Sequence, residues 1–286
     1  MDMLRHSPGW AARLFAKERA LRMVWEVEIG GQCSLLVGTA HFFPYRFRVA
    51  LRALVGRADV VLLEGPLDAD ARHKVVAAGS ARRGASLYDA LDAETLRKIN
   101  AVLQSPAPSS RSAELYWSVL RGSTPVTPGE EIRQLEPWMA FFRIWTEYRR
   151  RDGWMHSVDL DAADIAAAMK KDVNTLETIE EQIAALGRIP LQRIVDFLKE
   201  ADWEAYRRDY VRHYLEGNLG ALLAMAQAFP SYCEPVIEAR DPVLLERMLP
   251  YFERGKAVAF VGIMHCRGLV TLLRSRGHAV SGPPLP

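Results

Sequence analysis

Cysteine is scarce in this chain, and its few copies form no pattern. The 286 residues include Cys33, Cys233 and Cys266, with no Cys-x-x-Cys pair among them. An odd and sparse set of this kind does not support a disulfide framework. We therefore expect three free thiols, the state that is typical of a reducing compartment such as the cytoplasm.

Long apolar runs and an excess of either charge are also missing. No window reaches the run of about 18 apolar residues that a membrane span requires, and the charged residues Arg5, Arg13 and Lys17 argue against a secretory signal. A formal net charge of +2 gives no electrostatic reason to expect nucleic acid or an anionic membrane as a partner. The basic run 149–151 is interpreted as a solvated helix face. A cytoplasmic protein is expected, with a homo-oligomer as one option.

Two Gly-x-x-His tetrapeptides organise what is present. Gly38-Thr39-Ala40-His41 follows the apolar run 35–37, and Gly262-Ile263-Met264-His265 follows the apolar run 258–261. Short runs of aliphatic and β-branched residues that end at a glycine are typical of buried strands. Each histidine is thus predicted at the carboxyl end of a strand, where open sheets bind ligands.

The same succession of elements follows each tetrapeptide. A helix and then a strand are predicted in both cases, at 49–57 and 60–64 after the first and at 269–276 and 278–280 after the second. A chance histidine in a turn would explain either tetrapeptide alone. The repetition of the whole unit favours a shared, pseudo-symmetric site that contains both His41 and His265.

The predicted fold class is α/β (α+β), with the two strand–Gly-x-x-His–helix–strand units forming a central mixed sheet. A hydrophobic fraction of 49% and a charged fraction of 25% are ordinary for a globular chain of this length. Alternation in residues 24–29, followed by Gly30-Gly31, predicts a hairpin before the first unit. We expect one domain, with these boundaries: 1–286 for the whole, 23–66 for the first β/α unit, 67–230 for a helical insert and 231–286 for the second β/α unit.

Two charged residues accompany the histidines as candidates. Glu64 ends the apolar run 60–63 just before Gly65-Pro66, so its carboxylate either projects into a site or turns to water. Arg240 precedes the second unit, where a guanidinium is suited to bind a substrate carboxylate or a developing oxyanion. An ion pair with Glu238 or Asp241 explains Arg240 equally well on spacing alone.

In this order the motifs resemble the TraB/GumN family, which includes the TIKI proteins and is distantly related to erythromycin esterases and ChaN-like proteins. The matching segments extend over most of the chain: Gly38–His41, Leu62–Glu64, Leu135–Trp138, Ser157–Asp159, Leu176–Thr178 with Glu181-Gln182, Glu238–Asp241 around Arg240, and Val261–His265 with Gly268. The resemblance implies an active site of two Gly-x-x-His histidines and a glutamate, and a divalent-metal-dependent peptidase activity in the TIKI branch. The chain departs from the family pattern at Ser157 and at Cys266-Arg267.

Two imidazoles and one carboxylate are suited to Mn²⁺, Co²⁺ or Zn²⁺, with open positions for water and substrate. His41, His265 and Glu64 are the expected ligands, and Glu64 is alternatively the general base. A metal-free mechanism, in which one histidine oriented by Glu64 is the base, stays open. We further expect Asp159 and Glu177 as partners that orient the histidines, although Glu177 also fits an exposed helix start.

The function expected from these residues is a metal-dependent hydrolase that acts on an amide or ester bond, with a peptide as the favoured substrate and a small molecule as the other. Tyr45, close after His41, is expected to line the pocket. Two alternatives remain open. One is a protein that binds or sequesters a peptide, haem or signal molecule without turnover, and the other is a metal-independent esterase.

Overall fold

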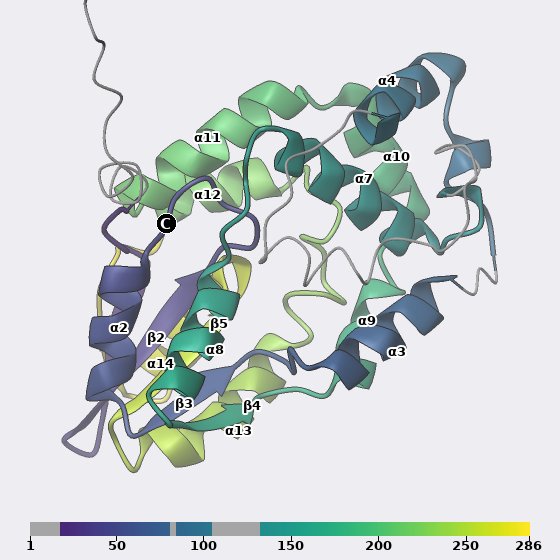
Figure 1. Ribbon diagram of the computed structural model, residues 1–286. Helices are drawn as coiled ribbons and strands as arrows, with labels where there is room; N and C mark the ends of the chain where they lie inside the picture. The colour runs from purple at the N-terminus through teal and green to yellow at the C-terminus, as the bar shows by residue number, and fades with distance from the viewer. Residues whose placement is uncertain (1–17, 81–83, 105–131) are drawn as a thin grey trace, which may run out of the picture.

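A six-stranded sheet forms the centre of the computed structural model, which describes residues 18–80, 84–104 and 132–286 (Figure 1). In spatial order the strands are β4 (Asp172–Thr175), β3 (Val60–Leu63), β5 (Ala257–Gly262), β2 (Gln32–Thr39), β1 (Val24–Ile29) and β6 (Ala279–Ser281). Strands β4, β3, β5 and β2 are parallel, whereas β1 is antiparallel to both β2 and β6. The predicted α/β class with a central mixed sheet is confirmed.

The hairpin of β1 and β2 forms where the sequence predicts it. Val27 pairs with Ser34 in the antiparallel ladder, and the turn is made by Gly30 and Gly31, whose φ angles are +57° and +78°. Both angles lie in the left-handed region that glycine adopts without strain. The hairpin places β2 next to β5, which comes from the other end of the chain.

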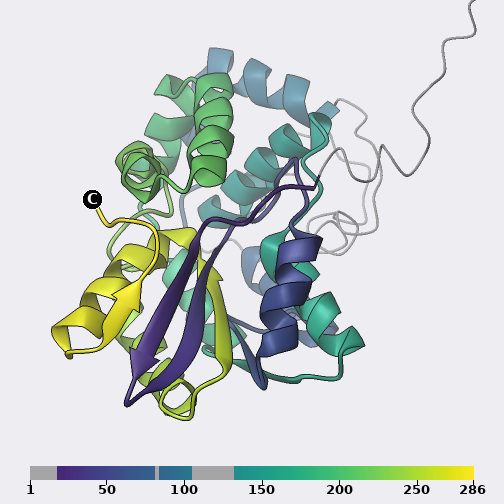
Figure 2. The same ribbon diagram turned by 90° about the vertical axis from the view of Figure 1, so that its left-hand side faces the viewer.

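Helices cover both faces of the sheet, as Figures 1 and 2 show. Helices α2 (Arg48–Arg57) and α8 (Val158–Ala168) pack together on one face, and α13 (Asp241–Phe252) and α14 (Cys266–Ser275) pack together on the other. This double covering explains why β5 is apolar along most of its length, because its side chains are buried on both faces.

The remaining helices lie mainly over the carboxyl ends of the parallel strands (Figure 2). They are α3 (Ala69–Ser80), α4 (Ala93–Gln104), α7 (Pro137–Arg151), α9 (Ile179–Leu186), α10 (Leu191–Glu200), α11 (Trp203–Glu216) and α12 (Leu219–Ala226), and short 3₁₀ turns form at η1 (Tyr88–Ala90) and η2 (Ile263–His265). Edge-to-face aromatic contacts such as Trp145 with Phe197 join this layer. None of the helices in the described ranges is long and apolar enough to cross a membrane.

The segment between β3 and β5 is not purely helical, which differs from the prediction for residues 67–230. Among its described residues it returns to the sheet once, as β4, which pairs with β3 at the edge. Only Val173 of its four residues is apolar, and that side chain is exposed. A strand of this kind carries no hydrophobic pattern from which the sequence could have predicted it. The proposed division into units within one domain remains a prediction.

The close approach of the two Gly-x-x-His segments predicts that Gly38 tolerates no side chain. A Cβ atom at Gly38 would meet the side chains of Ile263 and Cys266, so Gly38→Ala should lower the free energy of unfolding by about 1–3 kcal/mol. Urea denaturation measures this change. Gly56→Ala in α2 is the matched control, because the added methyl group meets nothing within 4 Å and the helix gains up to about 1 kcal/mol. Equal losses in both variants would contradict the close approach.

Candidate functional site

Three of the predicted residues lie at the carboxyl ends of neighbouring strands. Glu64 directly follows β3, His265 ends the 3₁₀ turn η2 after β5, and His41 lies shortly beyond β2. Strand β5 lies between β3 and β2 and is parallel to both. The carboxyl ends of these three strands therefore lie side by side. All three side chains line one cavity of about 430 Å³.

Most of the cavity wall is apolar, and His41, Glu64 and His265 are among its polar groups. Helices α3, α7 and α9 contribute apolar side chains to the wall, among them Val75, Met139, Phe142, Trp145, Ile179 and Leu186. A wall of this kind with a few convergent polar groups is the usual form of a site for a small molecule or a short peptide segment. The lining of this cavity therefore favours a ligand with a large apolar part.

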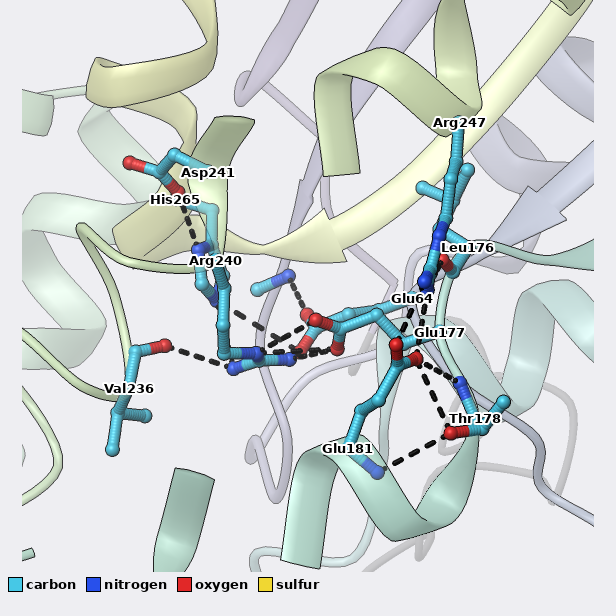
Figure 3. Close-up of polar contacts among 11 residues, drawn as sticks. Glu64, Leu176, Glu177, Thr178, Glu181, Val236, Arg240, Asp241, Arg247 and His265 are labelled. Atoms are coloured by element: carbon cyan, nitrogen blue, oxygen red, sulfur yellow. Dashed lines mark hydrogen bonds and ion pairs between the residues drawn. The ribbon is translucent and has the colours of Figure 1, made fainter. Parts of the chain in front are cut away.

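Arg240 forms the centre of a partly buried cluster of charges (Figure 3). Its Nη2 donates to Oε1 of Glu64 at 2.6 Å and also to Glu177, and its Nε donates to Glu177 at 3.0 Å. Its Nη1 donates to the Val236 carbonyl at 2.9 Å and lies 3.2 Å from Nε2 of His265. All five N–H groups of the guanidinium thus have partners within the protein.

Glu64 is held in its ionised form by this surrounding. Its Oε2 accepts the Gly262 N–H at 2.7 Å, while Arg240 binds Oε1. Burial alone would raise its pKa. The electrostatic effect of the neighbouring His265 and Arg240, together with the Gly262 hydrogen bond, outweighs burial and lowers the pKa to about 2. At any pH above about 4, Glu64 is therefore a fixed negative charge and a weak base.

Each of the two histidines has its own carboxylate partner, but their exposures differ. Nδ1 of His265 lies 2.6 Å from Asp241, and both side chains are buried. Nδ1 of His41 lies 3.0 Å from both carboxylate oxygens of Asp159, and the Ser157 hydroxyl also donates to that carboxylate. The His41 side chain is 51% exposed and opens onto the cavity.

Carboxylates set the protonation of His41. Burial within the cavity would lower its pKa, but the charge and hydrogen bond of Asp159, followed by the charge of Glu64, outweigh burial and raise the pKa to about 9. Phe42, the next residue, has a φ of +55°, an unusual conformation for a residue other than glycine. Such backbone is more common near functional sites than elsewhere.

The structure places the predicted residues in three ways. His41, Glu64, Asp159, Arg240 and His265 all line the cavity. Glu177 is buried and binds Arg240 rather than a histidine, as Figure 3 shows. Tyr45 is not among the cavity-lining residues and packs against Phe43 and Arg19 instead.

Two residues that contact these groups were not predicted. Asp241 binds His265, whereas its position beside Arg240 in the sequence indicated an ion pair with that neighbour. Arg149 lines the cavity and is only 7% exposed, so the interpretation of the run 149–151 as a solvated helix face is wrong for this residue. Arg150 is buried as well, in an ion pair with Glu147.

The arrangement of donors does not fit a resident divalent metal. Both carboxylate oxygens of Glu64 and both ring nitrogens of His265 already have protein partners, and the Arg240 guanidinium lies between them. A cation at this point would displace Arg240 or meet its charge. Within 18–80, 84–104 and 132–286, no group of three His, Cys, Asp or Glu side chains forms a metal-binding set. Metal dependence stays a prediction from the resemblance.

Comparison with models of known protein families finds a match, and it covers most of the chain. The family model described as the TraB/PrgY/gumN family matches residues 23–282. No curated protein and no solved structure matches the chain.

The His41–Asp159 pair predicts a specific dependence on pH. Asp159→Asn should lower the pKa of His41 from about 9, which NMR titration of the imidazole measures. The folded pKa lies above the value of 6.5 for an ordinary histidine, so the pair stabilises the fold fully below pH 6.5 and loses this effect as the pH rises through about 9. The difference in Tm between wild type and Asp159→Asn should shrink over that interval.

A neighbouring carboxylate on the same helix provides the control. Asp161 in α8 pairs with Arg48 rather than with His41, so Asp161→Asn should leave the His41 titration unchanged. A Tm difference for Asp159→Asn that stays constant from pH 6 to pH 10, or equal His41 titrations in both variants, would contradict the assigned pair.

Proposed function

The chain belongs to the TraB/PrgY/gumN family, and from the geometry of its cavity we propose that it is a hydrolase that cleaves an amide or ester bond. The observation that carries the proposal is the His41–Asp159 pair, which opens onto the cavity that Glu64 also lines. A histidine oriented by a carboxylate is an arrangement suited to general acid–base catalysis.

The proton path in this proposal begins at His41. Asp159 accepts the Nδ1–H, so Nε2 is the nitrogen that exchanges a proton with a water molecule in the cavity. As Nε2 takes the proton, the water oxygen attacks the carbonyl carbon of the substrate. The imidazolium then returns the proton to the departing amine or alcohol, which breaks the C–N or C–O bond.

The buried cluster supports this step electrostatically. Glu64, with its pKa of about 2, is too weak a base to compete with His41, and its fixed charge helps Asp159 to stabilise the imidazolium. Arg240 has no N–H group left for a substrate, so its role in the proposal is to hold Glu64 and Glu177 in position. It is a positioning residue rather than a catalytic one.

A peptidase that requires a metal and a protein that binds without turnover are the competing functions. The TIKI resemblance favours the first, and the apolar cavity favours the second. In the binding-only case the His41–Asp159 pair would have no chemical task. The cytoplasmic location and the oligomeric state stay predictions.

The direct test of the proposal is the loss of activity in His41→Asn. With p-nitrophenyl octanoate as the substrate, kcat/KM should fall on the order of 10²- to 10⁴-fold, which is the usual contribution of a general base. In the wild type, log kcat/KM should rise with pH and level off near the His41 pKa of about 9, because only the neutral imidazole accepts the proton. His213→Asn is the control, since that histidine lies on α11 and pairs with Glu216.

Chelation separates the competing functions. Prolonged dialysis against EDTA should leave the rate unchanged in a metal-free mechanism. A rate that is lost on dialysis and restored by Mn²⁺, Co²⁺ or Zn²⁺ would overturn that mechanism in favour of the metal-dependent peptidase. Octanoyl compounds that bind without turnover at any pH would favour the binding protein.

A further inference from the structure

Arg149 is a buried cation for which the described part of the chain provides no carboxylate. It lies in the last turn of α7, is 7% exposed, and forms no ion pair with any Asp or Glu of residues 18–80, 84–104 and 132–286. Its Nη1 donates to the His41 carbonyl at 3.2 Å, and its Nε is buried without a hydrogen-bond partner. Burying a charge without a counter-charge is costly, so a buried guanidinium of this kind that lines a cavity is a candidate to bind an anionic ligand.

The same helix shows how this fold treats a structural arginine. Arg143 and Arg150 are buried to a similar extent, and both bind the buried carboxylate of Glu147, at 3.1 Å and 2.8 Å. Arg149 differs from both because it lines the cavity. On this helix, the buried arginine without a carboxylate partner is therefore the one that lines the cavity.

Aromatic rings fix the direction of the Arg149 side chain. The guanidinium carbon lies 5.0 Å from the ring centres of Trp145 and Trp154 and 5.1 Å from that of Tyr210. These rings hold a cation without neutralising it. The guanidinium is thus held in place next to His41 and keeps its charge for a ligand.

We propose that Arg149 binds a carboxylate of the substrate, and that the substrate is an N-acyl amino acid: an apolar acyl chain joined by an amide to a residue with a free carboxylate. This inference rests on the proposed hydrolase. Arg149 donates to the backbone carbonyl of His41, so a carboxylate bound there lies within a few bonds of the amide that the His41-activated water attacks. A guanidinium is well matched to a carboxylate.

The rest of the cavity agrees with this class of substrate. One face of α7 lines the cavity from Trp138 to Arg149, a distance of about 16 Å, and apolar side chains precede Arg149 along it. An acyl chain along this face would be buried against Met139 and Phe142. The carboxylates of Glu64 and Asp159, which line the same cavity, favour a singly charged group over a doubly charged phosphate.

Calorimetry with octanoate and octanol tests the ligand class on the full chain. The wild type should bind octanoate on the order of 10- to 100-fold more tightly than octanol, the factor of one charge-assisted hydrogen bond. Arg149→Met should remove this preference, and Arg149→Lys, which keeps the charge without the planar fork, should keep part of it. The preference should persist near pH 10, where His41 is neutral and Arg149 is still charged.

Stability distinguishes ligand binding from a structural role. Arg149→Met without ligand should lower the Tm less than Arg143→Met does, because it removes a buried charge that has no carboxylate partner and loses only the aromatic contacts and one hydrogen bond to a carbonyl. Arg143→Met, the matched control on α7, should melt lower because it leaves Glu147 without one of its partners. If Arg149→Met does not fold, the wild type near pH 10 provides the test of ligand binding. A preference for octanoate over octanol there supports a carboxylate site that does not depend on the His41 charge, and no preference contradicts it.

Three results would overturn the inference: equal binding of octanoate and octanol by the wild type, an unchanged preference in Arg149→Met, or a preference that disappears near pH 10. Hydrolysis of N-octanoylglycine in preference to N-octanoylglycinamide is the catalytic readout. An octanoate preference that depends on Arg149 without any hydrolysis would keep the carboxylate site and overturn the proposed hydrolase, so the two failures are distinguishable.

Discussion

The parallel pairing of β2 with β5 is the constraint on which the site depends. It joins segments from opposite ends of the chain in a fixed register, in which Gly38 lies opposite Val261 and Thr39 opposite Gly262. The two Gly-x-x-His segments must therefore leave the sheet side by side. The pairing requires a glycine at position 38, where the 3₁₀ turn after β5 crosses close to β2. Without this contact, His41 and His265 would not share a cavity.

A buried ion cluster connects the long insert to that sheet. Arg240 comes from the segment before α13, and its two carboxylate partners come from the end of β3 and from the segment after β4. Removing charges from water is costly, and each member of the cluster is tolerated only because the others are present. Loss of Glu64 or Glu177 would leave part of the Arg240 charge uncompensated. The cluster thus fixes three segments that are distant in sequence around one point.

Hydrophobic patterns predicted the parts of the structure that are buried in a regular way. The runs before His41 and His265 and the run before Glu64 are apolar because β2, β5 and β3 are covered on both faces, so the strands and their ends were readable from the sequence. Strand β4 carries no such pattern. Asp241 and Arg149 were missed for another reason: their partners depend on how α13 and α7 pack, and a charged residue has the same appearance in a sequence whether it is buried or solvated.

The two histidines, alike in sequence, differ because the chain continues differently after each strand. After β5 the 3₁₀ turn begins at once and runs into α14, so His265 is fixed inside a helical turn and buried against Asp241. After β2 the chain passes through an irregular segment, with positive φ at Phe42, before α2 begins. This detour turns His41 toward the cavity, where Asp159 reaches it from α8. The same motif thus gives one histidine that is almost fully buried and one whose side chain is half exposed, and the difference originates in the backbone rather than in the motif.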